Sequence, residues 1–103
     1  MKKYDKLIRD KIPEIIAADG KEYEIEVMNE EEYKKYLQDK LVEEVEEYIE
    51  SEEIEELADV LEVMRAIAEL ENVDFDEIER IREEKKDERG GFENRLKLFK
   101  VFE

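Results

Sequence analysis

The chain has 103 residues, with 34 Asp and Glu against 18 Lys and Arg, so its formal net charge is −16. This charge repels phosphate backbones and argues against direct binding of nucleic acid. Cysteine and histidine are both absent, which excludes disulfides, thiolate zinc sites, Cys or His nucleophiles and an imidazole general base, so that an enzyme of this composition would work with carboxylates and a metal ion.

The amino-terminal part of the chain predicts a short helix followed by a strand. Asp10 stands where a helix cap is expected, Pro13 lies in the first turn, and Gly20 marks the end. Residues 23–28 then alternate apolar and acidic side chains, a period of two that is typical of a strand.

Two longer helices are predicted next. Asn29 and Glu32 have the spacing of a capping box, which starts a helix that runs to about Glu50. Ser51 is expected to cap the following helix, which is apolar around most of its circumference. A helix of that kind is buried in a bundle or in an oligomer interface.

The carboxyl-terminal part predicts a fourth helix and a second strand. Asp74 and Glu77 have the spacing of another capping box, and Gly90 follows the last helical position. Residues 95–102 are rich in Leu, Phe and Val, and we expect them to pair with residues 23–28. The predicted fold is therefore mainly α, an antiparallel helical bundle with one short β pair.

The whole chain, residues 1–103, is expected to form a single domain. No apolar run reaches the roughly 18–20 residues of a membrane span, and residues 1–10 lack the apolar segment of a signal peptide, so we expect a cytoplasmic protein without a membrane partner. Long amphipathic helices in so short a chain leave apolar faces uncovered. We therefore expect self-association into at least a dimer.

Two pairs of carboxylates mark the two central helices. Glu44 and Glu47 are three residues apart in the first, and Glu56 and Asp59 are three apart in the second. This spacing puts both members of a pair on one helical face, so two antiparallel helices can present all four carboxylates to a common point. The pattern predicts a divalent-metal site.

Helical phase supports the same interpretation. At roughly 100° per residue, Glu56 falls beside Val60 and Val63 on the apolar side of its helix, where it should be at least partly buried. Arg65 is the only basic residue from position 41 to 70, so a metal ion would supply the missing positive charge. Oxygen ligands favour Mg²⁺, with Mn²⁺ or Ca²⁺ as alternatives, over Zn²⁺.

A magnesium site of this composition points to a phosphate ester as substrate. A nucleoside triphosphate adds about four negative charges to the four carboxylates, which implies two or three ions. Water coordinated by Mg²⁺ can attack phosphorus without a histidine, because a free carboxylate can take its proton. Glu43, one residue from the predicted ligands, is the candidate catalytic base, and the alternative is a surface residue.

Basic side chains that could hold the phosphates occur in two places. Arg9 and Lys11 lie near the amino terminus, and Lys85, Arg89 and Arg95 lie around the two consecutive glycines. For Lys85 the alternative is a helix-end cation that complements the helix dipole. For Arg9 and Arg95 the alternative is a salt bridge.

Three segments resemble one protein family: KLIRDKIPEII at 6–16, the acidic pairs within 43–59, and RGGFENR at 89–95. They are similar to the MazG-like, all-α nucleoside triphosphate pyrophosphohydrolases, in the small single-domain branch related to phosphoribosyl-ATP pyrophosphohydrolase. The resemblance implies a dimer or tetramer of helices whose metal site is walled by both subunits. It also implies a fixed set of magnesium ligands, namely Glu44, Glu47, Glu56 and Asp59.

The activity implied by the resemblance is cleavage between the α and β phosphates, which gives a nucleoside monophosphate and pyrophosphate. Removal of noncanonical nucleotides is the expected role, and phosphoribosyl-ATP of histidine biosynthesis is the alternative substrate. Two hypotheses without catalysis stay open: an acidic interaction module that engages a basic partner, and a helical scaffold that binds magnesium without turnover.

Overall fold

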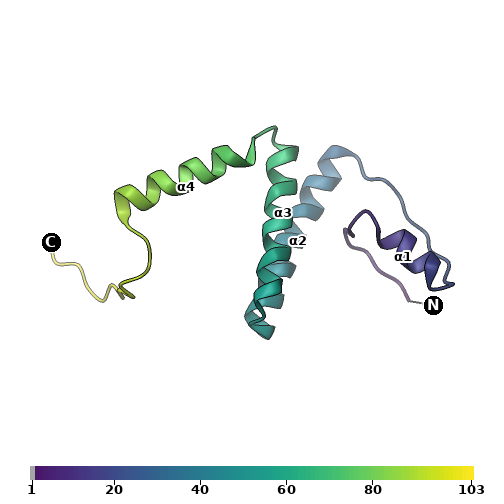
Figure 1. The fold of residues 1–103 in the computed structure, drawn as a ribbon, viewed down its shortest axis with the longest axis horizontal. Helices are drawn as coiled ribbons and strands as arrows, with labels where there is room; N and C mark the ends of the chain where they lie inside the picture. Colours follow the sequence, from purple (N-terminus) through teal and green to yellow (C-terminus); the bar gives the residue numbers. More distant parts are fainter. Residues whose placement is uncertain (1) are drawn as a thin grey trace.

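The computed structural model describes residues 2–103, and their regular structure is entirely helical. The helices are α1 (Ile12–Ala18), α2 (Glu30–Ser51), α3 (Ile54–Leu70) and α4 (Phe75–Arg89). α2 and α3 pack as an antiparallel hairpin in the middle of the molecule, with α1 on one side and α4 leading away on the other (Figure 1). The predicted mainly-α class is confirmed.

Side-chain and glycine caps explain where α2 begins and where α4 begins and ends. The side chain of Asn29 accepts a hydrogen bond from the backbone amide of Glu32 at 2.9 Å, which is the first of the two hydrogen bonds of the predicted capping box. Asp74 caps α4 as predicted, but it accepts from the amide of Asp76 at 3.0 Å and not from that of Glu77, so the predicted capping box is not formed there. Gly90 follows α4 with φ of 83°, in the region that glycine enters without steric cost.

Two of the predicted caps are wrong. Asp10 does not cap α1, because the N-cap position is Lys11, which makes no side-chain cap. Ser51 is the last residue of α2, and its hydroxyl accepts a hydrogen bond from the amide of Glu53 in the turn at 3.2 Å. Glu52 adopts a left-handed conformation with φ of 59°, which lets the chain reverse direction between α2 and α3 within two residues.

The packed core lies between α2 and α3 and is small. Leu37, Val63 and Ala68 are its buried apolar side chains. On the apolar face predicted for α3, Leu57 and Leu61 remain 43% and 45% exposed. The single chain therefore leaves much of that face uncovered.

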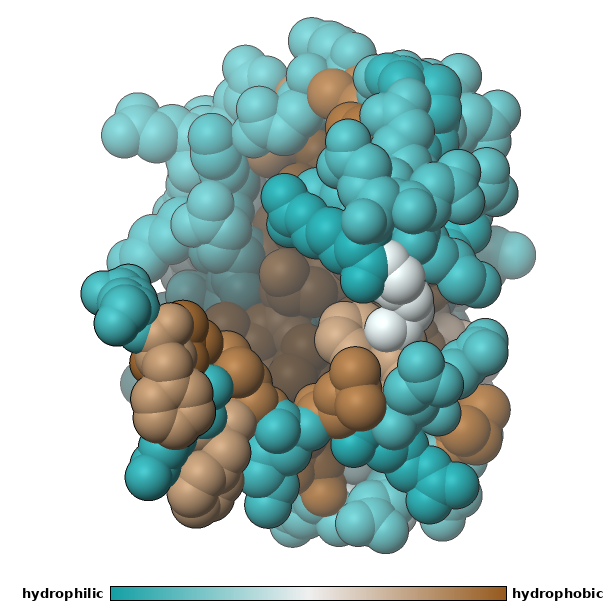
Figure 2. Space-filling model, turned by 90° about the vertical axis from the view of Figure 1, so that its left-hand side faces the viewer, coloured by the Kyte–Doolittle hydropathy of each residue, from teal (hydrophilic) through white to brown (hydrophobic). Residues whose placement is uncertain are grey.

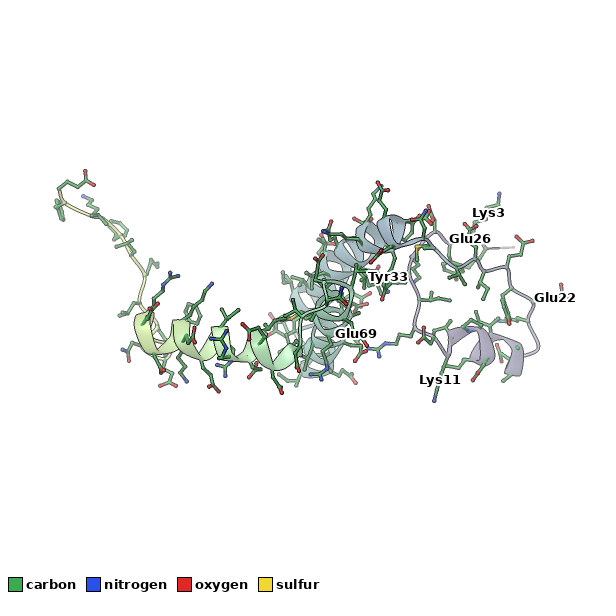
Figure 3. All side chains as sticks on the ribbon, turned by 90° about the horizontal axis from the view of Figure 1, so that it is seen from above. Lys3, Lys11, Glu22, Glu26, Tyr33 and Glu69 are labelled. Carbon is green, nitrogen blue, oxygen red and sulfur yellow. The ribbon has the colours of Figure 1, made fainter. Side chains whose placement is uncertain are left out.

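The predicted β pair is wrong for the single chain. Residues 23–28 and 95–102 contain no strand, and no backbone hydrogen bond joins them to each other in the part of the chain that the structure describes. The two segments lie on opposite sides of the central hairpin (Figures 1 and 3). Chain connectivity keeps them apart, because α4 carries the tail away from α2 and α3.

The molecule exposes more surface than a compact chain of its size. Its accessible area is 10002 Å², whereas a compact monomer of this size should expose about 6,200 Å². Its radius of gyration is 18.5 Å, against about 13 Å for a compact domain of similar length. The surplus area arises because α4 and both terminal segments extend from the hairpin (Figure 1). Among residues 2–103, no helix combines the length and apolar character that crossing a membrane demands.

Candidate metal centre

Five carboxylates from α2 and α3 meet across the hairpin, and we call them the acidic cluster: Glu43, Glu44, Glu47, Glu56 and Asp59. One oxygen from each of Glu43, Glu44 and Glu47 lies within 4.8 Å of the others, and the same holds for Glu44, Glu56 and Asp59. Glu44 belongs to both groups and so lies at the centre of the cluster. The structure thus brings three of the four predicted ligands, Glu44, Glu56 and Asp59, to one point, whereas Glu47 is grouped only with Glu44 and the predicted base Glu43.

The local fold accounts for this convergence. Spacing of three within each helix directs each acidic pair to one face, as the sequence predicted. The two-residue turn through Glu52 then sets the end of α2 against the beginning of α3. Glu56 lies in the first turn of α3, where the positive end of the helix dipole favours a carboxylate.

Glu44 is the buried member of the cluster, with a relative exposure of 7%. Burial raises the pKa of its carboxyl group, a hydrogen bond with Glu47 raises the pKa further, and contact with Lys40 lowers it. The Lys40 ammonium lies 3.3 Å from a Glu44 oxygen and 3.5 Å from a Glu43 oxygen. Two neighbouring carboxylates therefore share one ammonium group.

The α3 side of the cluster is also crowded with negative charge. Burial, followed by the charges of Asp59 and Glu44, raises the pKa of Glu56. The Arg9 guanidinium reaches Asp59 at 2.7 Å, which is the salt bridge that the sequence left open as an alternative for Arg9.

Hydrogen bonding within the cluster is satisfied, whereas charge is not balanced. Throughout residues 2–103, every buried side-chain polar atom has a hydrogen-bond partner. Over that same stretch, the cations in salt-bridge contact with the cluster are Arg9 and Lys40, against five carboxylates. Closely spaced carboxylate oxygens with an excess of negative charge are the donors that hard divalent cations prefer.

The sequence-based account of the neighbouring cations needs a correction. Arg65, the only basic residue from position 41 to 70, lies over the ring of Phe75 at 4.5 Å from its centroid. The cations in contact come instead from outside residues 41–70. Sequence reasoning missed Lys40, although it lies three residues before Glu43 and four before Glu44, a spacing that places them side by side on a helix. Arg9 lies far away in the sequence and reaches Asp59 only through the tertiary fold.

A small cleft opens beside the cluster, between the amino-terminal segment and α2. Its lining residues are Asp5, Lys6, Leu7, Lys35, Tyr36, Asp39, Lys40 and Glu43. The volume is about 220 Å³, below the roughly 300–1,000 Å³ of typical small-molecule sites. The Tyr36 hydroxyl donates to Asp5 at 2.6 Å, and this hydrogen bond is the main reason that the pKa of Tyr36 is raised to about 12.

The other predicted phosphate-binding residues are not brought to the cluster of their own chain. The Lys11 side chain extends to one side of α1 and does not reach the α2–α3 hairpin (Figure 3). Lys85 and Arg89 belong to the last turns of α4, and Arg95 begins the tail, on the far side of the hairpin from the amino-terminal segment (Figure 1). Within one chain, the residues from Lys85 onward therefore cannot serve the acidic cluster.

Comparison with protein-family models, with curated proteins and with solved structures finds no match for this chain.

Proposed function

We propose that the chain is a Mg²⁺-dependent nucleoside triphosphate pyrophosphohydrolase, which cleaves between the α and β phosphates and releases a nucleoside monophosphate and pyrophosphate. The observation that carries the proposal is the meeting of five carboxylates around a buried Glu44. A donor set made of carboxylates, with too few cations beside it, suits a hard divalent ion. Mn²⁺ is the alternative ion.

Glu44, Glu47, Glu56 and Asp59 would hold the metal. The two groups of carboxylates share Glu44, so the cluster could supply oxygen ligands to more than one ion. When bound, Mg²⁺ neutralises phosphate charge and makes a coordinated water more acidic.

Glu43 is the proposed general base. It belongs to the first group of the cluster and also lines the cleft. Its side chain is only partly buried, so water and substrate can reach it. A carboxylate placed between a metal site and an open cleft can take the proton of an attacking water.

Cations beside the cluster would hold the phosphates. Lys6, Lys35 and Lys40 line the cleft and offer positive charge within it. The Arg9–Asp59 ion pair is 58% and 40% exposed at its two side chains, and exposed pairs are worth only about 0–1 kcal/mol. Substrate phosphates can therefore compete with Asp59 for Arg9.

The cations of α4 and the tail would act on a second copy. α4 and the tail, which carry Lys85, Arg89 and Arg95, lie on the far side of the hairpin from the amino-terminal segment (Figure 1). The cleft by itself is smaller than a typical small-molecule site. We assign these three residues to the nucleotide site of a partner in a homo-oligomer. Removal of noncanonical nucleotides is the proposed role, with phosphoribosyl-ATP as the alternative substrate.

The test is release of pyrophosphate, distinguished from orthophosphate, with Mg²⁺ present. The panel holds standard, deoxy and deaminated nucleoside triphosphates together with phosphoribosyl-ATP. We expect Glu56→Gln to lower the rate at least 100-fold. Mutation of a residue that only hydrogen-bonds to a metal ligand already lowers metal affinity or activity about 10–100-fold, and Glu56 is a proposed ligand itself. Glu55→Gln is the matched control, since Glu55 is the exposed neighbour on the same helix and lies outside the cluster.

Two results would overturn the proposal. One is equal turnover by wild type and Glu56→Gln. The other is absence of pyrophosphate from every compound in the panel. In the second case, saturable Mg²⁺ binding by calorimetry would indicate the non-catalytic scaffold, and absence of Mg²⁺ binding would indicate the acidic interaction module.

A further inference from the structure

Two segments of the chain have the pattern of strands but no strand partner. In residues 23–28, Tyr23, Ile25 and Val27 alternate with acidic side chains. No backbone hydrogen bond involves residues 22–28 or 96–103 anywhere in the described chain. The apolar side chains are also open to solvent, with Val27 97%, Leu96 88% and Leu98 80% exposed.

The two segments cannot reach each other within one chain. The molecule is 62 Å long, and its amino-terminal and carboxyl-terminal segments lie at opposite ends of that length (Figures 1 and 3). Seen from the end that carries the tail, apolar side chains gather in the lower part of the surface and around a hollow at its centre (Figure 2). The apolar tail therefore remains uncovered in the monomer.

The charges of the two segments determine whether a segment can pair with its own copy or with the other segment. Residues 22–28 carry Glu22, Glu24 and Glu26, whereas the tail carries Arg95, Lys97 and Lys100. Like charges placed opposite each other destabilise a strand pair, and opposite charges stabilise it. Two copies of the acidic segment, or two copies of the basic tail, would therefore repel each other. The acidic segment of one copy and the basic tail of another are complementary.

The exposed surface of one chain is also large enough to form the interface of a stable dimer. The accessible area of 10002 Å² exceeds the expectation for a compact monomer by roughly 3,800 Å². Obligate homodimer interfaces bury about 2,000–5,000 Å² over both partners. Exposed apolar residues on the hairpin, namely Val42, Ile49, Ile54, Leu57 and Leu61, add to the surface that a partner could cover.

We propose that a second copy of this chain completes the fold by reciprocal strand exchange, in which residues 95–102 of each copy pair with residues 23–28 of the other. A copy turned end for end places its tail beside the amino-terminal segment of the first copy, and the same contact then forms at the other end. The contact is self-complementary and closes as a two-fold dimer. This inference does not depend on the proposed enzymatic function.

Cross-linking tests the exchange directly, because the natural chain contains no cysteine. We would prepare Glu24→Cys and Lys97→Cys as separate proteins, mix them after reversible unfolding and refolding, and add a short bismaleimide, whose reach tolerates a shift of register. The expected product has twice the chain mass and forms in the mixture. Each variant alone is the control and should give little such product, because its two thiols lie at opposite ends of the dimer.

Sedimentation velocity supplies a second measurement. Wild type is expected to sediment as a dimer, and Lys97→Glu with Lys100→Glu should raise the dissociation constant at least tenfold. Adding Glu24→Lys and Glu26→Lys to that variant should restore the dimer, which simple misfolding would not do. A monomeric wild type would overturn the proposal. So would a dimer that gives no cross-link in the mixture, because its interface would then lie elsewhere, on the exposed face of the hairpin.

Discussion

Glu44 shows how burial and neighbouring charge make the stability of the folded chain depend on pH. Its pKa is raised above the ordinary value of 4.5, first by burial and then by Glu47. The folded state therefore holds a proton more tightly than the unfolded state. Where the unfolded chain binds fewer protons, the free energy of unfolding falls as pH rises. The contribution of Glu44 is most favourable below pH 4.5 and is lost as pH rises through the higher pKa of the folded state.

We predict that Glu44→Gln flattens this pH dependence in metal-free protein. Glutamine has nearly the shape of glutamate and no charge, so the variant should gain stability relative to wild type as pH rises from 4 to 7. Urea unfolding with EDTA across that pH range measures the effect. Glu46→Gln, an exposed change on the same helix, is the control. A stability difference between wild type and Glu44→Gln that stays constant with pH would contradict the prediction.

At the scale of elements, the turn between α2 and α3 determines where the acidic pairs meet. Glu52 holds a left-handed conformation with φ of 59° there, which costs a non-glycine residue about 1–2 kcal/mol. Glycine avoids this cost but loses more backbone entropy on folding. We therefore expect Glu52→Gly to raise the free energy of unfolding by up to about 1 kcal/mol.

Chemical denaturation of Glu52→Gly and Glu50→Gly separates this effect from a general response to glycine. Glu50 lies inside α2, where glycine is less favourable than alanine by about 0.5–1 kcal/mol. The two substitutions should therefore change stability in opposite directions. A loss of stability in both variants would mean that the left-handed turn carries no strain that glycine can relieve.

For the whole molecule, we predict that Mg²⁺ stabilises the folded state by binding at the acidic cluster, and not merely by screening the negative net charge. A ligand that binds only the folded state, present at a concentration 100 times its dissociation constant, raises the free energy of unfolding by about 2.7 kcal/mol. Mg²⁺ should therefore raise the midpoint of thermal unfolding, and EDTA should reverse the rise. Calorimetry and thermal unfolding should show this response in wild type and Glu55→Gln and its loss in Glu56→Gln. An equal response in all three proteins would indicate general screening of the net charge of −16.

Several features of the protein follow from its sequence, because they depend on interactions between near neighbours in the chain. The cap at Asn29 and the end of α4 at Gly90 arise within a few residues, and both are confirmed. The same is true of the acidic pairs, since spacing of three and one short turn suffice to bring Glu44 and Glu56 together. The mainly helical class follows from the periodicity of α2 and α3.

Only the tertiary structure determined which distant groups meet. Arg9 contacts Asp59 across fifty positions of sequence, and no local periodicity encodes that distance. The strand-like segments 23–28 and 95–102 match in pattern and charge, yet the direction of α4 separates them within one chain (Figure 1). Local pattern specifies what each segment can pair with. The path of the connecting helices determines whether the partner is found in the same molecule.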